Sequence, residues 1–79
     1  MFYIYILKNI NGNIYIGQTN NLIGRLKRHN SGLTKSTKFG LPWKIIYSES
    51  FEKRSEAMRR EKGLKGGQGR EWIKEQFNS

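Results

Sequence analysis

The sequence predicts an α+β fold: a three-stranded antiparallel sheet opened by a β-hairpin and flanked by about three helices. Two runs rich in β-branched and aromatic residues, 2–8 and 13–18, flank a turn signal, and a third such run follows at 43–50. Segments with helical spacing of apolar residues separate and follow these runs. With 79 residues, 35% of them hydrophobic, the chain can bury one small core, so we expect a single domain over residues 1–79.

The first strand is apolar on both faces. Phe2, Ile4 and Ile6 alternate with Tyr3, Tyr5 and Leu7. Because successive side chains of a strand point to opposite faces, we expect both faces of this strand to be covered by other elements.

The hairpin loop leaves two registers open. A two-residue loop at Asn11-Gly12 would pair Tyr15 with Lys8 and place Tyr15 and Tyr5 on opposite faces. A three-residue loop, or a bulge at Gly12, would pair Tyr15 with Leu7 and place both tyrosines on one face. A site that uses both tyrosines requires the second register, whereas tyrosines in strands are by default packing residues.

Three helices are expected. The first is capped by Asn20 or Asn21, runs to about Asn30 and is ended by Gly32, and its inward side chains are Leu22, Ile23 and Leu26. The second covers about residues 52–65, with a capping start at Ser50 and a stop at Gly66-Gly67. The last covers about residues 70–77, and its docking stripe is Trp72, Ile73 and Phe77. Residues 31–42 are predicted to form a loop.

The charge distribution favours a polyanionic partner. Fifteen Lys and Arg face six Glu, giving a net charge of +9, and no acidic residue precedes Glu49. Single-sign segments of this kind favour phosphate binding over a merely solvated surface. The expected nucleic-acid-binding residues lie in the first helix and in the loop after it: Lys27, Arg28, Lys35 and Lys38.

The sequence contains no cysteine, which excludes disulfides and thiolate metal sites and fits a reducing, cytoplasmic setting. The apolar run at the start of the chain spans six residues, 2–7, and is too short to cross a membrane. We therefore expect a cytoplasmic protein without membrane contact.

The acidic residues limit the metal chemistry. There is no Asp, and the six Glu are accompanied by one His, so a metal ion would be held by very few protein ligands. On a helical wheel Glu61 falls on the apolar side of the second helix, together with Ala57, Met58 and Leu64. An inward carboxylate needs a cation, either an inward Arg or a metal ion, and the basic surroundings favour a metal or catalytic role. On the other side, i,i+4 pairs such as Glu56 with Arg60 are expected.

Arg25 and His29 are four residues apart and share one face of the first helix. A guanidinium there can stabilise charge on a phosphoryl group, and His29 could act as acid, base or hydrogen-bond donor. The alternative is that His29 is an exposed bystander.

Taken together, these residues resemble the GIY-YIG endonuclease family, and in particular small stand-alone members related to the GIY-YIG nuclease domain of excinuclease ABC. The two strand motifs that name the family read here Tyr3-Ile4-Tyr5 and Tyr15-Ile16-Gly17. The likeness continues through residues 20–22, 25–30, 43–47 and 56–65, which is nearly the whole chain.

The resemblance implies metal-dependent hydrolysis of phosphodiester bonds. Glu61 would bind Mg²⁺ or Mn²⁺ beside the scissile phosphate, and Tyr5 or Tyr15 would orient or deprotonate the attacking water. Arg25 would neutralise developing charge, and His29 would assist the tyrosine or the phosphate. Because a free tyrosine has a pKa of about 10, positive charge nearby is expected to lower it. Gly17 is the structural glycine of the second motif.

Three positions depart from the family pattern. Tyr3 replaces the first glycine, Gln18 occupies a position where related repair nucleases carry Lys, and Asn78 is the candidate for an asparagine that follows the last helix.

The substrate expected from this resemblance is DNA, with RNA as the alternative. One basic surface leaves little room for base readout, so binding is expected to be structure-directed or non-specific, in repair or recombination, and a protein partner or a homodimer could aid it. The alternative function is a non-catalytic nucleic-acid-binding module that keeps the scaffold.

Overall fold

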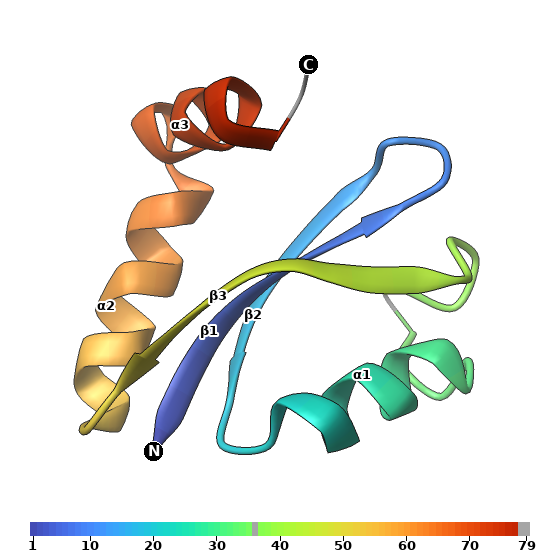
Figure 1. The fold of residues 1–79 in the computed structure, drawn as a ribbon, viewed down its shortest axis with the longest axis horizontal. Helices are drawn as coiled ribbons and strands as arrows, with labels where there is room; N and C mark the ends of the chain where they lie inside the picture. Colours follow the sequence, from blue (N-terminus) through green and yellow to red (C-terminus); the bar gives the residue numbers. More distant parts are fainter. Residues whose placement is uncertain (36, 78–79) are drawn as a thin grey trace.

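The fold is the α+β arrangement that the sequence predicts. The computed structural model describes residues 1–35 and 37–77. The elements in chain order are β1 (Phe2–Asn9), β2 (Ile14–Thr19), α1 (Leu22–Asn30), β3 (Trp43–Phe51), α2 (Arg54–Lys65) and α3 (Gly67–Phe77). The strands form one antiparallel sheet in the order β2-β1-β3, with the helices on either side of it (Figure 1). Within the described residues, no helix is long and apolar enough to span a bilayer.

The central strand β1 is covered on both faces, as its alternation predicts. Ile4 and Ile6 pack on one face in a cluster with Ala57 and Leu64 of α2 and Ile73 of α3. The opposite face carries a second cluster, in which Tyr5, Leu7 and Trp43 are packed against Leu22 and Leu26 of α1 and against Tyr15 and Ile45. The sheet therefore separates a core under α2 and α3 from a face under α1 (Figure 1).

The hairpin takes the register that a two-tyrosine site requires. Tyr15 pairs with Leu7, and Tyr5 pairs with Gly17. The amide of Asn9 donates to the carbonyl of Asn13, which leaves a three-residue loop, and Gly12 closes this loop with a φ of 83°. A left-handed residue at the last loop position is the usual feature of such loops, and Gly adopts it without steric cost.

Helix α1 follows the expected capping but not the expected inward face. Asn21 is the N-cap, and its side chain accepts a hydrogen bond of 3.0 Å from the amide of Gly24. Gly32, with a φ of 81°, follows the helix as predicted. Ile23, expected to point inward, is 72% exposed, because the sheet contacts the helix only along the Leu22 and Leu26 side.

Helix α2 begins later than predicted and is capped differently. Ser50 does not cap it, because β3 continues to Phe51 and the helix starts only at Arg54. Instead, the Glu56 carboxylate accepts a hydrogen bond of 3.2 Å from the amide of Lys53. Met58, expected on the apolar side, is 51% exposed, so the buried residues of this helix are Ala57 and Leu64.

Helix α3 starts at Gly67, before the predicted start at residue 70, because Gly66 breaks the chain direction and α3 resumes at once. Gly69 lets α3 approach α2 closely: a Cβ there would lie 2.4 Å from the Gly63 carbonyl oxygen. The predicted stripe of Trp72, Ile73 and Phe77 does dock on the core.

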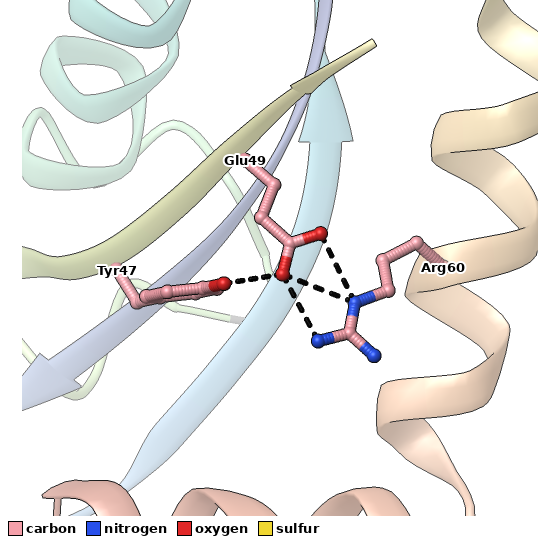
Figure 2. Close-up of polar contacts among 3 residues, drawn as sticks. All are labelled: Tyr47, Glu49 and Arg60. Carbon is pink, nitrogen blue, oxygen red and sulfur yellow. Dashed lines mark hydrogen bonds and ion pairs between the residues drawn. The ribbon is translucent and has the colours of Figure 1, made fainter.

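A polar network that the sequence did not indicate joins α2 to the edge strand β3 (Figure 2). Arg60 donates to Glu49, with its Nη2 2.9 Å from Oε2, and Tyr47 also donates to that carboxylate. The expected pair of Arg60 with Glu56 is therefore wrong. Burial alone would raise the pKa of Glu49, but the hydrogen bonds from Arg60 and Tyr47 hold it below its ordinary value.

Candidate active site

Two tyrosines and the single histidine meet on the α1 side of the sheet. The ring centroids of Tyr5 and Tyr15 are 6.3 Å apart, and the His29 ring lies edge-on to Tyr15 with a centroid distance of 4.9 Å. Tyr5 comes from the central strand, Tyr15 from the edge strand and His29 from α1. Tyr5 is only 2% exposed, whereas Tyr15 is partly exposed.

Gly17 makes room for the Tyr5 ring. It pairs with Tyr5 across the hairpin, and a Cβ at this position would lie 2.5 Å from the Tyr5 hydroxyl oxygen and 2.7 Å from the ring carbon that carries it. Real Cβ atoms do not approach this closely, so the ring can occupy this place only because residue 17 has no side chain. The glycine of the second strand motif thus has a steric reason.

His29 is fully buried and held through both ring nitrogens. Its Nε2 lies 2.9 Å from the Tyr5 hydroxyl, and its Nδ1 lies 2.8 Å from the hydroxyl of Thr37. The alternative of an exposed bystander is therefore wrong. Burial, with the positive charges of Arg25 and Arg28, lowers the pKa of His29, so the ring is neutral near pH 7.

The partners of Thr37 indicate which tautomer His29 adopts. The Thr37 hydroxyl lies 3.5 Å from the carbonyl oxygen of Thr34, to which it can only donate. Its oxygen then accepts the Nδ1 proton of His29, and Nε2 of His29 accepts the proton of the Tyr5 hydroxyl. The hydrogen bonds therefore run in one direction, from Tyr5 through His29 to Thr37.

The segment that carries Thr37 is fastened to the sheet by Trp43. The indole Nε1 of Trp43 donates to the Thr37 carbonyl at 2.8 Å. Asn30, which follows His29, exchanges two hydrogen bonds with the Trp43 backbone, at 2.7 and 2.9 Å. Sequence reasoning missed Thr37 and Asn30. Threonine and asparagine are common in loops, and no spacing pattern linked these two to His29.

The pKa of Tyr5 moves in the direction opposite to the expected one. Burial raises it, the Tyr15 charge raises it further, Arg25 lowers it, and the Glu61 charge raises it. Basic surroundings thus do not compensate for burial at this residue. Tyr5 is a protonated phenol at neutral pH, and charges on Arg25 of α1 and Glu61 of α2 both act on its hydroxyl.

Glu61 lies at the border between core and surface. Its side chain is 22% exposed, so the predicted inward direction holds only in part, and it pairs with Lys65 of the same helix at 3.2 Å. The alternative of a pair with an inward arginine is wrong, because the arginine on that side, Arg60, is bound to Glu49. A carboxylate whose recorded partner is a flexible, half-exposed lysine can exchange that partner for a metal ion.

The set of donors around Glu61 fits a hard divalent ion held by few protein ligands. Within residues 1–35 and 37–77, no three His, Asp or Glu side chains come close enough to share one ion. An ion at Glu61 would therefore take its other ligands from water and phosphate oxygens, as Mg²⁺ does readily.

The remaining predicted residues lie at the surface. Lys27 and Arg28 on α1, and Lys35 and Lys38 in the following loop, are all exposed. Tyr3 is partly buried and pairs with Thr19 across the hairpin. Asn78 lies outside the described residues.

Comparisons with known proteins agree with this architecture. The sequence matches the GIY-YIG catalytic domain over residues 1–75. It is 46% identical over 66 residues to a UPF0213 protein of Clostridium perfringens, covering 82% of this chain and 71% of that protein. It is 42% identical over 64 residues to a UPF0213 protein of Staphylococcus haemolyticus, covering 80% and 78% of the two chains.

The structure resembles the solution structure of a UPF0213 protein from Bacillus halodurans. The TM-score is 0.55 at 32% identity, over 92% of this chain and 82% of that one. That likeness extends over both sheet and helices, and together with the matched catalytic domain and the paired tyrosine motifs it establishes that the chain belongs to the GIY-YIG nuclease family.

Proposed function

We propose that this protein is a divalent-metal-dependent endonuclease that hydrolyses phosphodiester bonds of DNA. The observation that carries the proposal is the hydrogen-bonded arrangement of Tyr5 and His29 beside Tyr15, with the charges of Arg25 and Glu61 acting on it. A tyrosine site, an arginine and a single carboxylate are the groups that one-metal hydrolysis of a phosphodiester requires.

Tyr15 is the tyrosine that meets the attacking water. It is partly exposed, whereas Tyr5 is buried and its raised pKa keeps its proton in place. Tyr5 therefore orients: its hydroxyl donates to His29 and leaves its oxygen to accept a hydrogen bond. His29 and Thr37 keep that direction fixed.

Glu61 would hold Mg²⁺ or Mn²⁺, which supplies charge stabilisation at the phosphate and the leaving oxygen. Arg25 neutralises charge that develops on the transferring phosphoryl group. The exposed cations Lys27, Arg28, Lys35 and Lys38 contact the backbone of the nucleic acid, and contacts of this kind position a substrate without reading its sequence. Structure-directed or non-specific cleavage follows from such contacts, and it suits repair or recombination of DNA in the cytoplasm.

The test is cleavage of supercoiled plasmid and of branched DNA in Mg²⁺ or Mn²⁺. Glu61→Gln keeps the shape of the side chain and removes the charge, and we expect it to abolish cleavage. Glu52→Gln removes one carboxylate from an exposed position and is the matched control, expected to cleave like the parent. Arg25→Gln is expected to lower the rate at saturating metal.

Binding without cleavage by the parent, across metals and substrates, would replace this proposal with the non-catalytic nucleic-acid-binding module. Cleavage that survives Glu61→Gln would overturn the metal site.

A further inference from the structure

A groove lies between the β-hairpin and α3, beside the residues described above. Its volume is about 790 Å³, within the range of about 300–1,000 Å³ that is usual for ligand sites. One wall comes from β1 and β2, and the other from the end of α2 and from α3. Figure 1 shows α3 and the hairpin loop at the same end of the molecule.

The rim of the groove is strongly cationic. Lys8, Lys65, Arg70 and Lys74 line it, against one carboxylate, that of Glu71. Arg70 and Lys74 are four residues apart on α3 and exposed, so both side chains lie along one side of that helix. Neither forms an ion pair in the part of the chain that the structure describes. The rim thus complements a run of negative charges.

The floor of the groove is apolar. Ile14, Ile16 and Phe77 line it, and Ile14 is 39% exposed although it belongs to a regular strand. A polyanion whose apolar parts are covered would leave this floor wetted. A polyanion with open, flat apolar groups between its charges would cover it.

The groove is continuous with the candidate active site. Tyr15, the proposed water-orienting residue, lines it, and so does Lys65, whose ammonium group lies 3.2 Å from the Glu61 carboxylate. A strand that leaves the site along β2 enters the groove directly.

We infer that this groove binds an unpaired nucleic-acid strand adjacent to the scissile phosphodiester. Duplex DNA offers phosphates with its bases stacked inside, whereas a single strand offers both phosphates and free base faces, which match the cationic rim and the apolar floor. The inference rests on the proposed function and names its substrate: DNA in which a duplex passes into a single strand. None of the four rim cations belongs to the basic set on α1 and its loop, so the two surfaces are separate.

The experiment measures binding by fluorescence anisotropy in EDTA, so that cleavage plays no part. The probes are a labelled thymidine oligonucleotide and a blunt duplex of equal length, titrated over a range of salt concentrations. Arg70→Gln with Lys74→Gln removes two rim charges. Arg59→Gln with Lys62→Gln removes one Arg and one Lys from exposed positions of α2 outside the groove, and is the matched control.

We expect the rim variant to bind the single strand several-fold more weakly, with the slope of log K against log salt reduced by about 1.4, since about 0.7 is lost per phosphate contact. The control should keep the parent slope on the single strand. Ile14→Ser should weaken single-strand binding without a change of slope, because it alters the floor and no charge. Duplex binding should respond equally to the rim and control variants.

Equal slopes for the rim and control variants on the single strand would overturn the inference, and so would a loss of duplex binding as large as the loss of single-strand binding. These outcomes differ from failure of the proposed function, which is read from cleavage in the presence of metal: a protein that keeps groove binding and cleaves nothing refutes only the latter.

Discussion

Gly17 and Tyr5 face each other across the hairpin so closely that the glycine has no room for a methyl group. A Cβ at residue 17 would lie 2.5 Å from the Tyr5 hydroxyl oxygen, and the ring is buried and cannot swing outward. The position of the tyrosine therefore depends on its neighbour as much as on its own strand.

Gly17→Ala is expected to displace the Tyr5 ring and to destabilise the protein by about 1–3 kcal/mol, as overpacking does in tight sites. Cleavage should fall with it, because the hydrogen bond to His29 would be lost. Gly63→Ala is the control: a Cβ there meets nothing within 4 Å, and replacing a glycine inside α2 should stabilise the protein by about 0.5–1 kcal/mol. Urea denaturation of both variants decides, and equal stability of Gly17→Ala and the parent would contradict the steric argument.

The two tyrosines should differ when each is replaced by phenylalanine. Tyr15→Phe removes the hydroxyl that meets water, so the single-turnover rate should fall by about 10²–10⁴. Tyr5→Phe keeps the packing and removes only an orienting hydrogen bond, so its loss should be smaller. Single-turnover cleavage at saturating metal measures both. A larger loss for Tyr5→Phe would exchange the roles assigned to the two residues.

Thr37 should act on the reaction through His29. Thr37→Val keeps the shape and removes the oxygen that accepts the Nδ1 proton at 2.8 Å, whereas Thr37→Ser retains it. We expect slower cleavage and a changed tautomer population, seen in the ¹⁵N shifts of the imidazole, for the valine variant, with rescue by serine. An unchanged imidazole spectrum in Thr37→Val would remove Thr37 from the account.

The Glu49 network should make part of the stability depend on pH. The folded-state pKa of Glu49 lies below its ordinary value of 4.5, so the stabilisation is complete above that pH and is lost as the pH falls through the folded-state pKa. Glu49→Gln should cost about 1 kcal/mol at pH 7, a modest value because the side chains are partly exposed, and should flatten the acid limb of the stability curve. Denaturation midpoints between pH 7 and pH 3 provide the measurement, and parallel curves for variant and parent would exclude the network as the cause.

The sequence predicted the fold class, the order of the elements and the helix caps of α1, because these depend on local patterns: alternation in β1, Asn21 before the helix and Gly32 after it. It did not predict the pair of Glu49 with Arg60, since the residues come from different elements and the local alternative, Glu56, was nearer in sequence. The start of α2 was misplaced for a similar reason. Ser50 is a good N-cap residue, but strand pairing with β1 takes it first.

For the candidate site, spacing identified its residues but not their arrangement. That Tyr5 and Tyr15 share a face depended on a loop geometry that the sequence left open. The burial of His29 and its bond to Thr37 depend on how residues 31–42 fold back, which no periodic pattern encodes.

The three-residue hairpin loop has a consequence for natural variation. Ile10, at its tip, is 89% exposed, and exposed loop tips are normally where chains accept insertions and deletions. Here, the deletion of a single loop residue would keep every residue of the site and, if the strands re-paired by one position, turn Tyr15 to the other side of the sheet. Length at this loop is therefore under a constraint that its amino-acid identities are not, and relatives that differ from this chain in loop length should differ in activity before they differ in fold.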